Sequence, residues 1–490
     1  MSTEPEAAER PPISVRRRIS LAVGTLLVIV IAFAVASWAY QRGQTSNRLQ
    51  ALIARLDETD PGWKLDELVA ARPEPPAGQN SADVALAVAK LVPGNWPYWD
   101  ADPAYESRRF DGLPTPNLLD PERAKMLADE MRRLAPALAE ARRLAAMPYG
   151  RHKLDFGPNP WNVLLRDQQD TRRSAALLSY DAWDRAQRGD VAGALLDGRA
   201  AINAGRSLGD EPIGISQLIR AACVAVGLGS IERTLALGEA SDADLAEVQK
   251  LLRLEGQHST TLVVMRGERA SQHATYDGIA TGKLSHAEAF GGPGVTPVAA
   301  WWLNWFGMPG LNLPRQHLRT LEMLTELAEA TKLPADHQLP AEKAVEAKIE
   351  ALPRGEMFVK LLLPAVLKMN QAFRRKAAQL RALDALLAAE RYRLKIGRWP
   401  EKLHDIPREL LPPPLPLDPY DGHPVRYRRT ADGVVAYCVG EDLRDDGGDV
   451  GRVSGRQQKD WGYQLWDVNK RRQPPLPKPK ADEGPPGPGQ

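Results

Sequence analysis

The chain is poor in cysteine, in aromatic residues and in net charge. Its only two cysteines are Cys223 and Cys438, which excludes a disulfide-rich scaffold and paired CxxC metal sites. Lys and Arg number 64 against 62 Asp and Glu, so the formal charge of +2 lacks the basic excess of a nucleic-acid-binding protein. Cys223 stands in an apolar helical context typical of a core residue. A single long-range disulfide between the two cysteines stays open at this point.

The common catalytic motifs are also missing. The sequence contains no H-E-x-x-H and no G-x-S-x-G. Residues 278–285 are similar to a phosphate-binding loop, but the spacing is one residue short and Leu284 stands where Ser or Thr would hold Mg²⁺. His286 and Glu288 form an H-x-E pair without the P-C-x-x-C of zinc deaminases. We therefore expect no catalytic residues and favour a non-enzymatic role.

One long apolar run is present near the start. Residues 19–40 contain no charged side chain, and as a helix they would span roughly 30 Å, the thickness of a hydrocarbon core. Arg16, Arg17 and Arg18 precede the run, and the positive-inside rule places the N-terminus in the cytoplasm. We predict a disordered cytoplasmic tail at 1–18 and a transmembrane helix at 19–41. A cleaved signal peptide, cut near Ala34–Ser37, is the competing interpretation.

The middle of the chain has helical periodicity. Residues 42–80 are expected to form a stalk, with Leu49, Leu52 and Leu56 on one face, followed by a linker. A helical body follows at 81–367. Its expected helix starts are at Asn80/Ser81, at Asp120 followed by Pro121, and at Ser241.

Residues 170–208 predict two antiparallel helices joined at Gly189-Asp190. Their alternation of small and large apolar residues resembles a helical hairpin of the tetratricopeptide kind. No second copy follows at a fixed period, so a regular solenoid is not indicated.

An aromatic segment, 289–314, interrupts the helical pattern. Trp301, Trp302, Trp305 and Phe306 either form a partner or membrane-surface patch or fill the helical core. No basic face accompanies them, which favours the core.

The last hundred residues combine a helical pattern with patterns typical of β-strands. A long helix at Met369–Ile396 should end at Gly397, and strands are expected at 425–428, 434–439 and 463–468. The predicted fold is thus mainly α, with one N-terminal transmembrane helix, a helical-hairpin body and a small C-terminal α+β module at 368–468. Residues 469–490, rich in Pro and Gly, are expected to be a disordered tail.

Residues 388–449 resemble the C-terminal domain of the major pseudopilin of type II secretion systems. The matching residues are Gly397, Trp399, Pro400, Leu403, Asp418, Pro419, Tyr420, Gly422, Pro424, Tyr427, Tyr437, Gly440, Asp442, Gly447 and Gly448. The chain lacks a prepilin-peptidase site, and a long helical region separates its anchor from the module. The resemblance therefore implies a pseudopilin-like antiparallel module appended to a helical body, not a pilus subunit.

In that family the loop between the last strands binds calcium. The resemblance implies a Ca²⁺ site, and the carboxylates available in this loop are those of Asp442, Asp445, Asp446 and Asp449. Leu443 replaces a family glycine and Cys438 a family serine. The alternative is a hairpin loop whose carboxylates face water.

Together these features predict a single-pass protein of the bacterial inner membrane, with its N-terminus in the cytoplasm and its bulk outside. We expect a scaffold role in the envelope. The expected partners are the lipid bilayer, through residues 19–41, and an envelope protein, with no nucleic acid. The alternative is a membrane-tethered hydrolase with a dispersed active site.

Overall fold

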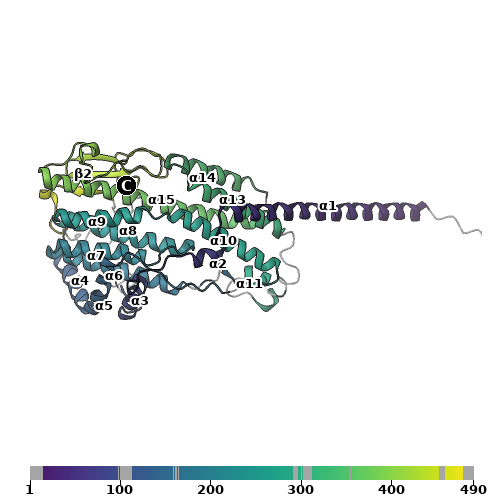
Figure 1. The fold of residues 1–490 in the computed structure, drawn as a ribbon, viewed down its shortest axis with the longest axis horizontal. Coiled ribbons are helices and arrows are strands. Elements are labelled where there is room, and N and C mark those ends of the chain that lie inside the picture. Colours follow the sequence, from purple (N-terminus) through teal and green to yellow (C-terminus); the bar gives the residue numbers. More distant parts are fainter. Residues whose placement is uncertain are drawn as a thin grey trace, which may run out of the picture.

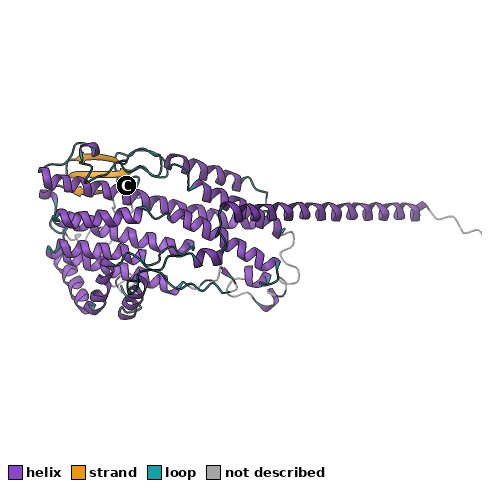
Figure 2. Ribbon diagram, in the orientation of Figure 1, coloured by secondary structure: helices purple, strands orange, loops and turns teal. Residues whose placement is uncertain are grey.

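The computed structural model describes residues 15–97, 99, 113–157, 159–160, 163, 165–290, 296–299, 301, 312–353, 355–451 and 458–477. It shows an elongated, mainly helical body from which one long helix projects, with a small sheet at the far end from that helix (Figure 1, Figure 2). The helices are α1 (Val15–Thr59), α2 (Leu65–Ala70), α3 (Ser81–Leu91), α4 (Pro121–Arg133), α5 (Ala135–Ala141), α6 (Arg166–Arg188), α7 (Val191–Arg206), α8 (Gly214–Leu237), α9 (Asp242–Gly256), α10 (Thr260–Ala280), α11 (His286–Phe290), α13 (Leu313–Ala330), α14 (Ala335–Glu350) and α15 (Met357–Ile396). The strands are β1 (Arg426–Thr430), β2 (Gly433–Cys438) and β3 (Trp461–Trp466).

The projecting helix α1 joins the predicted apolar segment and the predicted stalk without a break. Its apolar residues from Val23 to Tyr40 are exposed, whereas Leu49 and Leu56 are buried against Leu318 and Leu321 of α13. Helix α8 is also apolar enough to cross a membrane, but most of its apolar stretch is buried, as expected of a core helix. The predicted N-terminal apolar helix is therefore confirmed.

The predicted helix starts are confirmed at the atomic level. Asn80 and Asp120 accept hydrogen bonds from the first-turn amides of α3 and α4, and Ser241 does so for α9. The helix expected from Asp120 onward is interrupted at Leu134, because Pro136 lacks the amide hydrogen that a continuous helix would use. A short 3₁₀ segment, Arg142–Ala146, follows α5.

The predicted hairpin is confirmed as α6 and α7. Gly189 ends α6 in the left-handed conformation, with φ of 85°, and α8 packs across both helices. Glycine is needed where α7 meets α8, because a Cβ on Gly227 would lie 2.6 Å from Cγ1 of Ile202. Close helix packing thus explains the small residues of this region.

The C-terminal module is a helix over a three-stranded antiparallel sheet of order β1-β2-β3. All three strands begin and end within two residues of the predicted bounds. The helix α15 starts at Met357, twelve residues before the predicted Met369, and contains Pro364. One hydrophobic cluster contains residues of α7, α8, α9, α15 and the sheet, so the module shares its core with the body.

The segment after β3 differs from the prediction of a disordered tail at 469–490. Gln473 forms a parallel bridge with Asn117, and its carbonyl accepts a 2.8 Å hydrogen bond from the amide of Leu118. Arg471 reaches buried Glu390 at 2.8 Å. The start of this tail is therefore packed on the body, because its two arginines have acceptors there. Residues 478–490 lie outside the described part.

Two open questions from the sequence are answered. Cys223 and Cys438 are both buried and free, so they do not pair. Trp301 is 53% exposed, which contradicts the preference for a core position at this residue. Trp302, Trp305 and Phe306 lie outside the described residues.

Candidate functional site

The predicted calcium residues lie in the loop that follows β2. Gly447 and Gly448 adopt left-handed conformations, with φ of 77° and 80°, and fold the backbone back toward β3. Leu443 is also left-handed, with φ of 60°, which is uncommon for a residue with a side chain. The carboxylates of this loop are thus carried on a tightly turned backbone.

Most of these carboxylates are engaged within the protein. Asp442 Oδ1 accepts a hydrogen bond from the amide of Arg444 at 3.1 Å. Asp445 Oδ1 accepts from Tyr437 Oη at 2.9 Å, and its Oδ2 lies 3.4 Å from Arg426 Nε. The loop is therefore held by local hydrogen bonds and by a cation from β1.

Asp446 and Asp449 lie on the other side of the turn. Asp446 Oδ1 pairs with the ammonium of Lys459 at 3.0 Å. The backbone amide of Asp449 donates to Asp460 Oδ2 at 3.3 Å. In the described part of the chain, no three His, Cys, Asp or Glu side chains lie where they could hold one metal ion. As placed, the four predicted residues do not converge, and the calcium site stays a prediction.

Arg426 is the central cation of this region. Its guanidinium lies 2.7 Å from Asp418 and 2.5 Å from Asp421, in addition to its contact with Asp445. Asp418 is fully buried and also accepts the amide of Val439 at 2.7 Å. Burial raises the pKa of Asp418 to about 6, although its hydrogen bonds oppose the change. Asp418 therefore ties the segment before β1 to the residue that follows β2.

Asp460, which sequence reasoning missed, holds the loop after β2 in place by accepting backbone hydrogen bonds. Its side chain is fully buried, and its Oδ2 accepts the amides of Gly448 at 2.8 Å and Asp449 at 3.3 Å. Burial raises the pKa of this carboxyl. The available signal was its position directly before Trp461, the first residue of β3, but a residue on a separate segment could not be assigned to the loop from spacing alone.

A second polar cluster joins the end of α1 to the body. Trp63 is fully buried, and its indole Nε1 donates to Asp57 Oδ1 at 2.9 Å. Asp60 accepts hydrogen bonds from Arg266 and from Arg269 of α10, and the Arg269 guanidinium lies over the Trp63 ring at 5.4 Å. Burial raises the pKa of Asp60, but the two arginines outweigh it and leave that pKa lowered. The projecting helix is thus locked to the body by charge and by packing.

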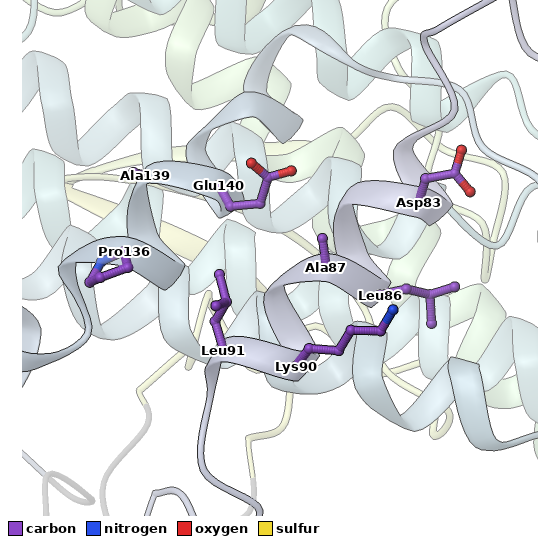
Figure 3. A pocket seen from close by; sticks show the side chains of 8 residues that line it. All are labelled: Asp83, Leu86, Ala87, Lys90, Leu91, Pro136, Ala139 and Glu140. Carbon is purple, nitrogen blue, oxygen red and sulfur yellow. The ribbon is translucent and has the colours of Figure 1, made fainter.

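An open groove of about 760 Å³ lies between α3 and α5. Its lining side chains come from these two helices alone, and Figure 3 shows apolar Ala87, Leu91 and Pro136 among charged Lys90 and Glu140. The charged groups do not meet at one point in this view, so the groove has the character of a contact surface.

Comparison with known protein families, with curated proteins and with solved structures finds no match to this chain. Its function is therefore argued from its own geometry.

Proposed function

We propose that this chain is a single-pass membrane protein of the bacterial envelope whose body serves as a scaffold. The observation that carries the proposal is the division of α1 into an exposed apolar half and a half that packs on the body. Val, Leu, Ile and Phe side chains are exposed on successive turns of this half. Their exposure is unfavourable in water and favourable in the hydrocarbon core of a bilayer.

The orientation follows from charge. Arg16, Arg17 and Arg18 precede the apolar half, which supports a cytoplasmic N-terminus and an extracytoplasmic body. The helix runs unbroken through Ala34–Ser37 and on to Thr59, which supports an uncleaved anchor over a signal peptide.

The scaffold role is supported by how firmly the anchor is attached. Leu49, Leu56 and Trp63 are buried against the body, and Asp60 joins two arginines of α10. A mobile tether needs none of these contacts. A body held in this way presents its surfaces, such as the groove between α3 and α5, at a fixed place beside the membrane.

Calcium ordering of the C-terminal loop remains part of the proposal. It is supported by four carboxylates on one loop and by the left-handed backbone of Leu443 at the family's glycine position. Binding requires Asp445 to leave Arg426 and Asp446 to leave Lys459, so we expect weak affinity. Calcium should raise the melting temperature of the full-length protein and Asp442→Ala should abolish the rise. An unchanged melting curve with wild-type protein would return the loop to the water-facing alternative.

The anchor is tested by fusions and by fractionation. Alkaline phosphatase fused after Gln490 should be active, and the same enzyme fused after Arg18 should be inactive, because it folds only outside the cytoplasm. The full-length chain should stay in the membrane pellet after carbonate washing, with its N-terminal residues intact. Recovery in the soluble fraction, or a mature N-terminus near Ser37, would refute the anchor.

A further inference from the structure

Four helices of the body meet at one buried carboxylate. Glu255, near the end of α9, has no exposed surface. Its Oε2 lies 2.8 Å from Arg206 Nη1 of α7 and 2.6 Å from Arg220 Nη2 of α8. Its Oε1 lies 2.8 Å from the ammonium of Lys376 on α15. Figure 1 shows these four helices running side by side along the body.

The charges of this cluster do not balance. One carboxylate faces three cations, and the side chains of Arg206, Arg220 and Lys376 are 7%, 3% and 6% exposed. A buried cation without its own counter-charge is costly, because the low-dielectric interior does not replace its hydration. Burial lowers the pKa of Lys376, although Glu255 opposes the change. An additional anion would relieve this excess.

A pocket of about 280 Å³ opens onto the cluster. Arg206 and Arg220 form its cationic part, and the apolar walls come from Pro73, Pro75, Pro148, Tyr149 and Leu254. In the described part of the chain, Arg206 uses Nε for the carbonyl of Pro148 and Nη1 for Glu255, which leaves Nη2 without an acceptor. The pocket thus combines a donor and positive charge with apolar surface.

The other charged groups at the pocket do not cancel this excess. Glu74 is paired with Arg151 at 2.6 Å. Asp210 lies at the rim, 3.2 Å from Nδ1 of His258. Burial lowers the pKa of His258 to about 3, so its ring is neutral at physiological pH. The positive charges of Arg206, Arg220 and Lys376 are thus opposed by two negative charges, on Glu255 and Asp210. A net charge of one positive unit remains.

A purely structural role accounts for part of the geometry. Arg206 and Arg220 also bind the carbonyls of Pro148 and Gly209, which fixes the turns around the pocket. That role does not require three cations around one carboxylate, nor a pocket that reaches two of them.

We propose that this pocket binds the carboxylate or phosphate group of a small organic anion, with the guanidinium of Arg206 as its main contact and Arg220 as its electrostatic support. Guanidinium groups match such oxyanions in geometry and charge. The proline and tyrosine walls would contact the carbon part of the ligand. The inference does not depend on the membrane proposal, because it uses only the body.

The test is calorimetric titration of the full-length protein in a nonionic detergent. Sodium phosphate and sodium acetate serve as separate probes, at an ionic strength held constant with sodium chloride. Saturable binding of either probe at one site is expected. Binding of phosphate alone or of acetate alone identifies the preferred group, and both outcomes support the site. Absence of saturable binding for both probes would overturn the proposal.

Three variants at the rim leave the buried cluster intact, and a fourth, at Arg206, removes the proposed main contact. Gln257 is exposed, lines the pocket and caps α9 through its backbone only. Gln257→Glu should weaken anion binding roughly fivefold, and the matched Gln257→Lys should strengthen it by a similar factor. Asp210→Asn should also strengthen binding. Arg206→Gln should abolish it, with melting temperature as the control for folding. Equal affinity in both Gln257 variants would place the bound ion elsewhere and refute the assignment.

Discussion

The junction between α1 and the body gives the sharpest prediction. Replacing Asp60 by Ala removes the acceptor of Arg266 and Arg269, and the Arg269 side chain is 1% exposed. Breaking a buried ion pair on one side costs about 3–5 kcal/mol, because the remaining charge stays buried. Since the Asp60 side chain is 18% exposed, water offsets part of this, and we expect a loss of about 2–4 kcal/mol from the stability of the junction.

That loss should appear as local opening rather than as unfolding of the body. Trp63, Leu49 and Leu56 form a hydrophobic cluster of their own with Leu318 and Leu321 of α13. At about 1.4 kcal/mol per tenfold change, amide hydrogen exchange in the last turns of α1 should accelerate roughly 30- to 700-fold. Hydrogen-exchange mass spectrometry of the full-length protein in detergent measures this directly.

The matched control is Asp66→Ala. Asp66 is an exposed acid in the first turn of α2, a few residues from the junction. It should leave exchange in α1 unchanged. Unaltered exchange in the Asp60→Ala protein would show that the arginines do not hold the junction and that α1 is not rigidly attached through them.

Three further outcomes are expected. Burial lowers the pKa of His152 to about 4 and of His258 and His317 to about 3, so these rings are neutral in the fold and protonate in the unfolded chain below its value of 6.5. Each of these histidines should lower stability by about 2 kcal/mol at pH 5, so His152→Asn should shift the difference in stability between pH 5 and pH 7 by about 2 kcal/mol in favour of pH 5, and an unchanged difference would contradict this. Leu443→Gly should stabilise the protein by about 1 kcal/mol, because glycine adopts the left-handed backbone without strain, and a lowered melting temperature would refute it. Non-reducing electrophoresis of denatured protein with alkylated thiols should show no shift on reduction, since Cys223 and Cys438 are free.

Local signals in the sequence were enough for much of the fold. The caps at Asn80, Asp120 and Ser241 and the left-handed Gly189 and Gly397 depend on neighbouring backbone atoms only. Such features can be predicted because each requires few residues in a fixed order.

The features that the sequence did not predict depend on tertiary contacts. The start of α15 was placed too late, because the helix continues through Pro364, where Val359, Leu363 and Val366 are buried in a tertiary cluster. Asp460 and Glu255 show no motif, since their partners come from distant segments. No spacing rule brings α7, α8, α9 and α15 to one carboxylate.

The unbroken course of α1 has a mechanical consequence. Its 45 residues extend over about 68 Å as one helix, which continues through Gly43 where the apolar half gives way to the packed half. In the proposed membrane placement, a tilt of this continuous helix would tilt the body and the sheet at its far end by the same angle. The body would then stay at one height above the proposed membrane, and a partner would have to reach it at that height.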